Sequence, residues 1–400
     1  MVSDSSVTNA GSWIGAHHET LLDPGSANTI ETVGALTLVE GRCNGRLVHV
    51  AMTNRAVAGG SFGVDESNCL SSFLLHSRDD LMPIALVLDS GGARLDSGLA
   101  GLAAFRRMYR AALDVRLAGV PMVALVERDC FGGASMLAML CTVRGALHTA
   151  RIGMSGPAIV EALSGKQDLD ASDRAAVRAL FGAPARVQTG AIDVMFDAQV
   201  TRRDALARLV QDAIDKQTDV RAQHHKLQRR LQDAGIDTGS LSLVDAAAPF
   251  RRGVPVGAVE IWQLSDAILS CRPGAVVTLH VDCPGQAASR HDEMLVLSEY
   301  VAHLAQCLRD RSSAGVEIIM RIEGEAAGGI YVAFAAGSIR VEATPKATLR
   351  VLPAAAIQVV LGKTFPDETL ADALATGVVD RVLTSNDRGA APGQPLSAPR

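Results

Sequence analysis

The feature that most constrains this chain is a repeated order of segments: an apolar run, a glycine-containing turn, and then apolar residues at helical spacing. The four apolar runs are residues 81–89, 120–126, 275–281 and 316–322. Short apolar runs bounded by glycine are typical of strands buried in a parallel sheet. The helical spacing follows in residues 99–118, 134–141, 295–311 and 330–336. Because the order occurs twice in each half, we predict an α/β fold built by duplication.

The remaining segments divide the chain around these two halves. Residues 36–52 are rich in β-branched side chains on either side of Asn44-Gly45, which predicts a β-hairpin. We expect an irregular lead-in, an N-terminal domain, a solvated helical connector with a linker, a C-terminal domain and a disordered tail. Their expected ranges are residues 1–34, 35–215, 216–249, 250–385 and 386–400.

Composition excludes several classes of protein. The net charge is −5, whereas a general nucleic-acid binder normally carries a basic surplus. The seven cysteines form no CxxC pair, so we expect reduced thiols and neither a disulfide framework nor a metal site. The adjacent histidines His224 and His225 lie in a polar stretch, where we expect them to be solvated. No apolar run is long enough to cross a bilayer, so we expect a soluble, cytoplasmic protein without a membrane anchor.

Three glycine pairs lie where a strand ends and a helix begins: Gly91-Gly92, Gly132-Gly133 and Gly328-Gly329. A helix N-terminus presents unpaired N–H groups, and glycine lets a ligand oxygen approach them. Such a turn suits a phosphate or a carbonyl oxygen that becomes negative during a reaction. The alternative is that each pair only makes a tight turn. Arg94 follows the first pair and has two interpretations: it binds a phosphate or carboxylate, or it forms a structural salt bridge.

At this point the motifs resemble those of the carboxyltransferase family, whose members have a crotonase-type fold. The matching segments in the first half include SGGAR at residues 90–94 and CFGGAS at residues 130–135. Within the family, this half resembles the β subunit of bacterial malonate decarboxylase. The second half resembles the γ subunit through DCPGQAASRHDEM at residues 282–294 and GEAAGGIYVAF at residues 324–334. The chain thus resembles a shortened fusion of both subunits.

The resemblance implies two crotonase-like domains in tandem, with an active site between an N-type and a C-type domain. It implies decarboxylation of a malonyl thioester to the acetyl thioester, with no permanently bound cofactor and no metal. The thioester would be carried by a CoA-type or phosphopantetheine-type arm on a separate acyl carrier protein. Further decarboxylase subunits and a homo-oligomer are also implied. Two alternatives stay open: a carboxyltransferase that uses biotin on a separate carrier, and a non-catalytic scaffold of the same fold.

The resemblance also assigns roles to residues. Gly132 and Gly133 match the family's oxyanion position for the acyl group. Gly328 and Gly329 match a second oxyanion position, which faces the ureido oxygen of biotin in biotin-dependent relatives. Gly91, Gly92 and Arg94 match the turn near the thioester and its arm, and Ser135 is included among the substrate-binding residues. The proton that completes the acetyl methyl group needs a donor or an ordered water; Ser135, Glu325 and Tyr331 are the open candidates.

Overall fold

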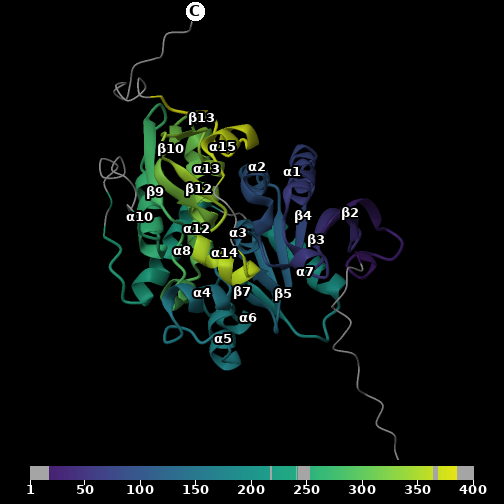
Figure 1. Cartoon of the computed structure of the whole chain (residues 1–400). Coiled ribbons are helices and arrows are strands. Elements are labelled where there is room, and N and C mark those ends of the chain that lie inside the picture. Colours follow the sequence, from purple (N-terminus) through teal and green to yellow (C-terminus); the bar gives the residue numbers. More distant parts are fainter. Residues whose placement is uncertain (1–17, 217–218, 240, 242–252, 364–367, 385–400) are drawn as a thin grey trace, which may run out of the picture.

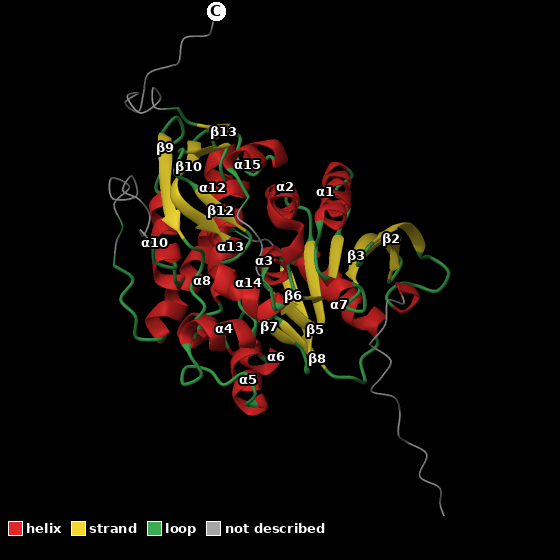
Figure 2. Cartoon of the chain, viewed as in Figure 1, coloured by secondary structure: helices red, strands yellow, loops and turns green. Residues whose placement is uncertain are grey.

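Each half of the chain contributes one β-sheet, and the two halves lie side by side in a computed structural model (Figure 1). The structure describes residues 18–216, 219–239, 241, 253–363 and 368–384. The expected disordered tail and most of the expected linker lie outside the described residues. The fold is mixed α/β, as predicted (Figure 2).

The first sheet has eight strands in the order β1-β2-β3-β4-β5-β6-β8, with β7 paired to β5. The strands are β1 (Asn28–Val33), β2 (Leu36–Cys43), β3 (Arg46–Thr53), β4 (Ile84–Ser90), β5 (Met122–Phe131), β6 (Val143–Leu147), β7 (Arg151–Gly153) and β8 (Val194–Phe196). Strands β2 and β3 form the predicted antiparallel hairpin. Its turn has positive φ at Asn44 (52°) and Gly45 (77°), which matches the right-handed twist of the strands. From β3 onward the pairings are parallel.

The second sheet is parallel and is centred on β10. Its strands are β9 (Val276–Cys283), β10 (Glu317–Ala327), β11 (Arg340–Ala343), β12 (Thr348–Arg350) and β13 (Arg381–Val382). Strand β10 extends beyond the predicted 316–322, because its last residues pair with β12. The third Gly-Gly pair, Gly328-Gly329, follows directly after this extension.

Helices connect and cover the strands, and each of the four predicted helical segments is present. The α-helices are α1 (Val64–Asp79), α2 (Gly98–Leu117), α3 (Gly133–Leu140), α4 (Pro157–Ser164), α5 (Arg174–Phe181), α6 (Ala183–Gln188), α7 (Arg202–Asp215), α8 (Val220–Asp233), α10 (Ala258–Leu269), α11 (Arg290–Met294), α12 (Leu297–Ser313), α13 (Gly328–Gly337), α14 (Ala354–Leu361) and α15 (Leu370–Thr376). Short 3-10 turns occupy His18–Thr20, Ala58–Gly60 and Leu95–Ser97.

The central strands of the first sheet, such as β4 and β6, are buried on both faces, and successive side chains of β4 point to different cores. On β4, Ala85 and Val87 pack in the cluster that contains α7, whereas Leu86 and Leu88 pack in the larger cluster. The larger cluster continues without interruption into α12, α13 and β10 of the second half. The two halves therefore share one hydrophobic core, and their relative position is fixed by packing.

Two expectations about the flanking segments are wrong. Strand β1 covers Asn28–Val33, inside the lead-in that we expected to be irregular, because it pairs with β2. The helix expected in the connector is present as α8, but it is not solvated on all sides. Its residues His224, Leu227 and Leu231 lie on one face and are buried against α10 and α12. His224 is buried and stacks on Trp262 with ring centroids 4.8 Å apart, so the expectation of a solvated side chain is wrong for His224, whereas His225 is exposed as expected.

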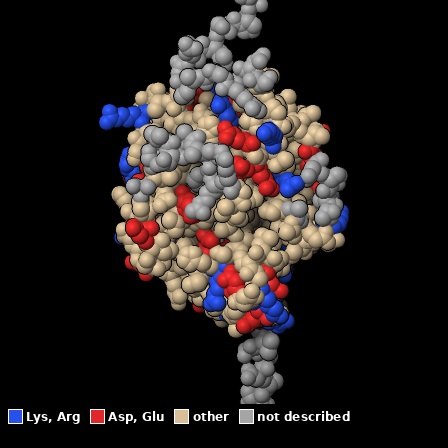
Figure 3. All heavy atoms as spheres, turned by 60° about the vertical axis from the view of Figure 1, so that its left-hand side comes forward, with Lys and Arg blue, Asp and Glu red and all other residues tan. Residues whose placement is uncertain are grey.

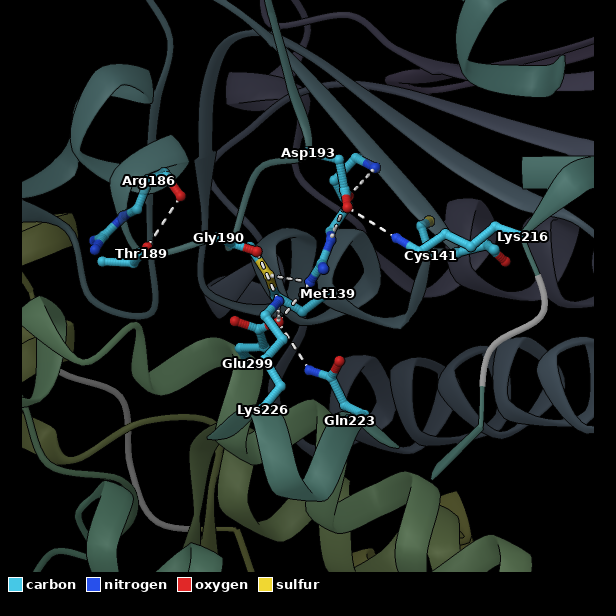
Figure 4. Close-up of polar contacts among 12 residues, drawn as sticks. Met139, Cys141, Arg186, Thr189, Gly190, Asp193, Lys216, Gln223, Lys226 and Glu299 are labelled. Atoms are coloured by element: carbon cyan, nitrogen blue, oxygen red, sulfur yellow. Dashed lines mark hydrogen bonds and ion pairs between the residues drawn. The ribbon is translucent and has the colours of Figure 1, made fainter. Parts of the chain in front are cut away.

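Two basic residues of α8 belong to a buried ionic cluster, part of which is drawn in Figure 4. The carboxylate of Glu299 on α12 is only 1% exposed. It accepts hydrogen bonds from Lys226 (2.9 Å) and Arg230 (2.6 Å) on α8, and from Arg144 (2.8 Å) on β6. The cations of the expected connector thus neutralise a carboxylate between the two halves.

The described surface carries mixed charges and no candidate membrane segment. On the face in Figure 3, basic and acidic side chains are interspersed. No helix in the described ranges combines the length and apolar character that membrane crossing requires. All seven cysteines are free thiols.

Candidate functional site

Each half has two turns that follow the carboxyl ends of neighbouring parallel strands, which makes four turns in all. In the first half, Gly91-Gly92 follows β4 and Gly132-Gly133 follows β5. In the second half, Pro284-Gly285-Gln286 follows β9 and Gly328-Gly329 follows β10. Because β4 pairs with β5 and β9 pairs with β10 in parallel, the turns of each half meet at one sheet edge.

The two glycine pairs of the first half touch backbone to backbone. A Cβ atom on Gly92 would lie 2.7 Å from the carbonyl oxygen of Phe131 and 3.0 Å from the nitrogen of Gly133. Gly92 has φ 100° and Gly132 has φ 55°, which L side chains rarely adopt. Glycine is therefore required at position 92 by both close approach and conformation, whereas at position 132 only the positive φ favours it, since the nearest atom to a Cβ there would be 3.6 Å away.

Most amides of these two turns are already used within the protein. Gly91 N–H donates to the Gly59 carbonyl, and Gly92 N–H donates to Ser90 Oγ, both at 3.1 Å. Gly132 N–H donates to the Met154 carbonyl at 3.1 Å. Gly133 is the first residue of α3, so its N–H has no acceptor within the helix and lies at the positive end of the helix dipole. Among the four predicted glycines of this half, Gly133 is the best candidate for an oxyanion donor.

The second half repeats this arrangement with one difference. Gly328 has φ 64° and is the first residue of α13. Gly329 N–H donates to the side-chain oxygen Oε1 of Gln286 at 3.0 Å. The carboxamide of Gln286 thus lies at the predicted second oxyanion position. Sequence reasoning gave Gln286 no role, although it stands in the quoted DCPGQ motif and an amide carbonyl is a natural acceptor for this N–H.

Two methionines separate the glycine turns of the two halves. A Cβ atom on Gly329 would collide with Met154 Cε and would lie 2.7 Å from Met136 Sδ. Met136 belongs to α3, which begins at Gly133, and Met154 accepts the Gly132 N–H through its carbonyl. The structure therefore brings the predicted glycines of both halves to one region within a single chain.

The predicted side chains near the turns are held by other protein groups. Arg94 forms an ion pair with Glu66 and donates from Nε to Ser61 Oγ at 3.2 Å, which is the structural interpretation. Ser135 is buried and donates to the Gly132 carbonyl at 2.7 Å. Tyr331 donates to the Val378 carbonyl at 2.6 Å, and burial raises its pKa to about 12. Glu325 lies 3.4 Å from Arg350.

A cavity of about 750 Å³ is lined by residues of β4, β5 and α7, and none of the glycine turns lines it. Its charged lining includes Arg55, Asp89, Glu127 and Arg202. Burial raises the pKa of Glu127 to about 7, although Arg202 opposes this shift. Its acids and bases are largely paired with one another, so it offers no clear ligand preference. Within the described residues, no group of acidic, histidine or cysteine side chains could hold a metal ion.

Comparisons with known proteins match both halves. Residues 8–224 match the family model of the carboxyl transferase domain, and residues 251–380 match that of the malonate decarboxylase gamma subunit. The chain is 31% identical over 123 residues to the methylmalonyl-CoA carboxyltransferase 12S subunit of Propionibacterium freudenreichii subsp. shermanii, covering 30% of this chain and 23% of that protein. It is 31% identical over 122 residues to the acetyl-coenzyme A carboxylase carboxyl transferase subunit beta of Fusobacterium nucleatum subsp. nucleatum, covering 30% and 40%.

The alignments to these two curated relatives span less than half of each relative's length. Among solved structures, a Pseudomonas malonate decarboxylase hetero-tetramer in complex with malonate has a TM-score of 0.50 and 24% sequence identity to the chain. That match covers 56% of this chain and 89% of the other. At this identity the likeness concerns the fold, and it agrees with the predicted crotonase-like architecture.

Proposed function

Because the chain belongs to the carboxyl transferase family, we propose that it removes CO2 from a malonyl thioester and leaves the acetyl thioester. The match of residues 251–380 to the gamma subunit of malonate decarboxylase supports decarboxylation as the reaction. One observation carries the proposal: the Gly91-Gly92 turn packs against the Gly132-Gly133 turn, next to the Gly133 N–H at the start of α3.

The reaction needs a stabilised negative charge on the thioester oxygen. The bond between the carboxylate carbon and the α-carbon breaks, CO2 leaves, and the electron pair passes into an enolate whose oxygen becomes negative. In the proposed pose the Gly133 N–H donates to that oxygen, and Gly92 has no side chain that would block the approach. Removing one such donor typically lowers the rate about 10²–10³-fold.

The α-carbon of the enolate then takes a proton and becomes the acetyl methyl group. Of the three candidate donors, Ser135 and Tyr331 both donate their hydroxyl protons to backbone carbonyls, and the Glu325 carboxylate pairs with Arg350 at 3.4 Å. We therefore propose that an ordered water supplies the proton, since neither hydroxyl is available without breaking an internal bond.

The position of Gln286 supports decarboxylation over transfer of the carboxyl group to biotin. The family resemblance assigns the ureido oxygen of biotin to the Gly328-Gly329 position in biotin-dependent relatives. In this chain the Gln286 carboxamide oxygen already accepts the Gly329 N–H. Carboxyl transfer to biotin is the second candidate, because the two curated relatives described above are carboxyl transferase subunits.

We propose that the malonyl group arrives on a separate acyl carrier protein through a CoA-type arm. We also propose that the chain works in an assembly with further copies or subunits. The solved Pseudomonas malonate decarboxylase is a hetero-tetramer, and this supports the proposal of an assembly. Native mass spectrometry of the purified chain, alone and with loaded carrier protein, tests both proposals.

Intact mass spectrometry of the acyl group tests the reaction. The protein is mixed with malonyl-CoA or a malonyl-loaded carrier protein, each with and without a biotin carrier. Loss of the mass of CO2 without biotin supports the proposal. Loss only with the biotin carrier, with mass gained on that carrier, replaces it with carboxyl transfer. No change in any mixture refutes both, and leaves the non-catalytic scaffold.

A matched pair of variants tests the role of the Gly133 amide. Proline removes this N–H and suits the first position of a helix, but its Cβ would collide with the ring of Phe105. We therefore compare Phe105→Leu with the double variant Phe105→Leu/Gly133→Pro. The double variant should be about 10²-fold slower than Phe105→Leu. Equal rates in the two folded variants would contradict the oxyanion role.

A further inference from the structure

Glu293 is a carboxylate of the second half that is buried against the first half. It lies on α11 and is 0% exposed. Its oxygen Oε2 accepts from Met154 N–H at 3.1 Å, and its oxygen Oε1 accepts from Ser155 N–H at 2.6 Å. Both carboxylate oxygens of one half therefore hold two consecutive backbone amides of the other half.

The segment that Glu293 holds is in direct contact with the candidate oxyanion turn. The Met154 carbonyl accepts the Gly132 N–H at 3.1 Å. Gly132 adopts φ 55°, and the peptide plane that follows it contains the Gly133 N–H. A shift of Met154 would therefore change the orientation of Gly132 and turn the Gly133 N–H away from its target.

A buried arginine completes the connection. Arg186 on α6 donates from Nε to the Ile152 carbonyl at 2.8 Å and from Nη1 to the Glu293 carbonyl at 2.7 Å. Its Nη2 lies 3.5 Å from Glu293 Oε2. One guanidinium thus ties the segment before Met154 to the backbone of α11. Glu293 also has the charged neighbour Asp292 on its own helix.

We propose that Glu293 is a positioning residue for the Gly133 amide, so that docking of the second half sets the oxyanion geometry of the first. This inference rests on the proposed function, in which the Gly133 N–H stabilises the enolate. In this inference the second half is needed to orient the Gly132-Gly133 turn of the first half, whether or not the second half also contacts the substrate. Glu293 itself touches no reacting atom.

Substitution by glutamine isolates the effect. A carboxamide has one acceptor oxygen, so in Glu293→Gln either Met154 or Ser155 faces an NH2 group. We expect kcat to fall about 10²-fold, as for the loss of one oxyanion donor, with KM changed less than about threefold.

Glu299→Gln is the matched control. Glu299 is equally buried between the halves, and it accepts hydrogen bonds from Gln223, Lys226, Arg230 and Arg144. None of these four residues hydrogen-bonds to Gly132, Met154 or Ser155 in the described part of the chain. A positioning role predicts a kcat within about threefold of wild type for Glu299→Gln, even if that variant is the less stable one. Equal losses of kcat in both variants, in step with their melting temperatures, would overturn the proposal.

A pH profile gives a second readout. Burial raises the pKa of Glu293 to about 7, against the opposing effects of Arg186 and of the Ser155 and Met154 amides. The protonated carboxyl group has lost an acceptor, so kcat of the wild type should fall as pH decreases through about 7. Glu299→Gln should keep this limb and Glu293→Gln should lose it. Retention of the limb in Glu293→Gln would also overturn the proposal.

Hydrogen exchange separates this inference from the proposed function. Peptides covering residues 130–136 and 150–156 should exchange faster in Glu293→Gln than in wild type and in Glu299→Gln, whatever the substrate is. If the wild type releases no CO2, the proposed function fails, and the positioning contact is judged from exchange alone. Unchanged exchange of both segments in Glu293→Gln refutes the contact itself.

Discussion

Replacing Glu299 by glutamine should remove a large part of the stability that joins the two halves. The Glu299 carboxylate accepts four hydrogen bonds of 2.6–2.9 Å, three of them from cations. The carboxamide retains one acceptor oxygen and turns an NH2 group toward buried positive charge. Breaking a buried pair in this way costs about 3–5 kcal/mol. Because Lys226 is 28% exposed and can regain water, we expect a loss near the lower end, about 3 kcal/mol.

Urea unfolding at pH 7, followed by circular dichroism, measures this change in the free energy of unfolding. The control is Glu317→Gln, which removes an exposed carboxylate 3.8 Å from Arg340. Such a pair contributes less than about 1 kcal/mol. A loss below about 1 kcal/mol in Glu299→Gln would refute the argument, since it would mean that the three cations are satisfied without the carboxylate.

The same carboxylate predicts an acid limb of stability. Burial opposes its ionisation, but Arg230, Arg144 and Lys226 together hold the pKa of Glu299 well below its ordinary value of 4.5. Below pH 4.5 the unfolded chain therefore binds more protons than the folded one, and the free energy of unfolding falls as pH decreases. Glu299→Gln should show a shallower fall over this range than wild type. If the free energy of unfolding of Glu299→Gln fell with pH as steeply as that of wild type, Glu299 would not be the source of this acid dependence.

Two further predictions concern the glycine turn and the thiols. Gly92→Ala should stop CO2 release and lower the melting temperature, because the added Cβ would lie 2.7 Å from the Phe131 carbonyl oxygen and φ is 100°. The control is Gly119→Ala, where φ is 73° and no atom lies within 4 Å of the added Cβ. This control bears only the backbone cost of about 1–2 kcal/mol and should keep its activity. Native protein should react slowly with Ellman's reagent at pH 8, because six of its cysteines are buried, and because burial and the neighbouring Glu31 raise the pKa of Cys69 to about 12. All seven thiols should react in denaturant. A rapidly reacting thiol in the native protein would contradict the assigned burial.

The sequence predicted the strands, the helices that follow them and the glycine turns because each depends on local pattern. The run at residues 120–126 and its glycines are adjacent in sequence, and β5 and α3 form there. The same reasoning failed for residues 220–233. Their basic composition is typical of a solvated helix, and only the position of Glu299 on α12 shows that these cations are needed inside.

For the candidate site, local pattern identified which glycines lie at helix starts, but it could not say which amides are free. Gly132 and Gly133 are equivalent in sequence, and a carbonyl 22 residues away, that of Met154, distinguishes them by accepting the Gly132 N–H. Arg94 was compatible with ligand binding until the structure placed Glu66 beside it. Gln286 and Glu293 were not identified as functional because each acts on a turn far along the chain.

By itself, the sequence determined the α/β class, the duplication and the places where strands give way to glycine-initiated helices. These follow from hydrophobic periodicity and from the conformational freedom of glycine, which act over a few residues. The tertiary structure alone decided that both sets of glycine turns meet within one chain, that Gln286 accepts the Gly329 N–H, and that a buried carboxylate binds the segment next to Gly132. Hydrogen bonds between distant segments depend on how the halves pack, and no local pattern records that packing.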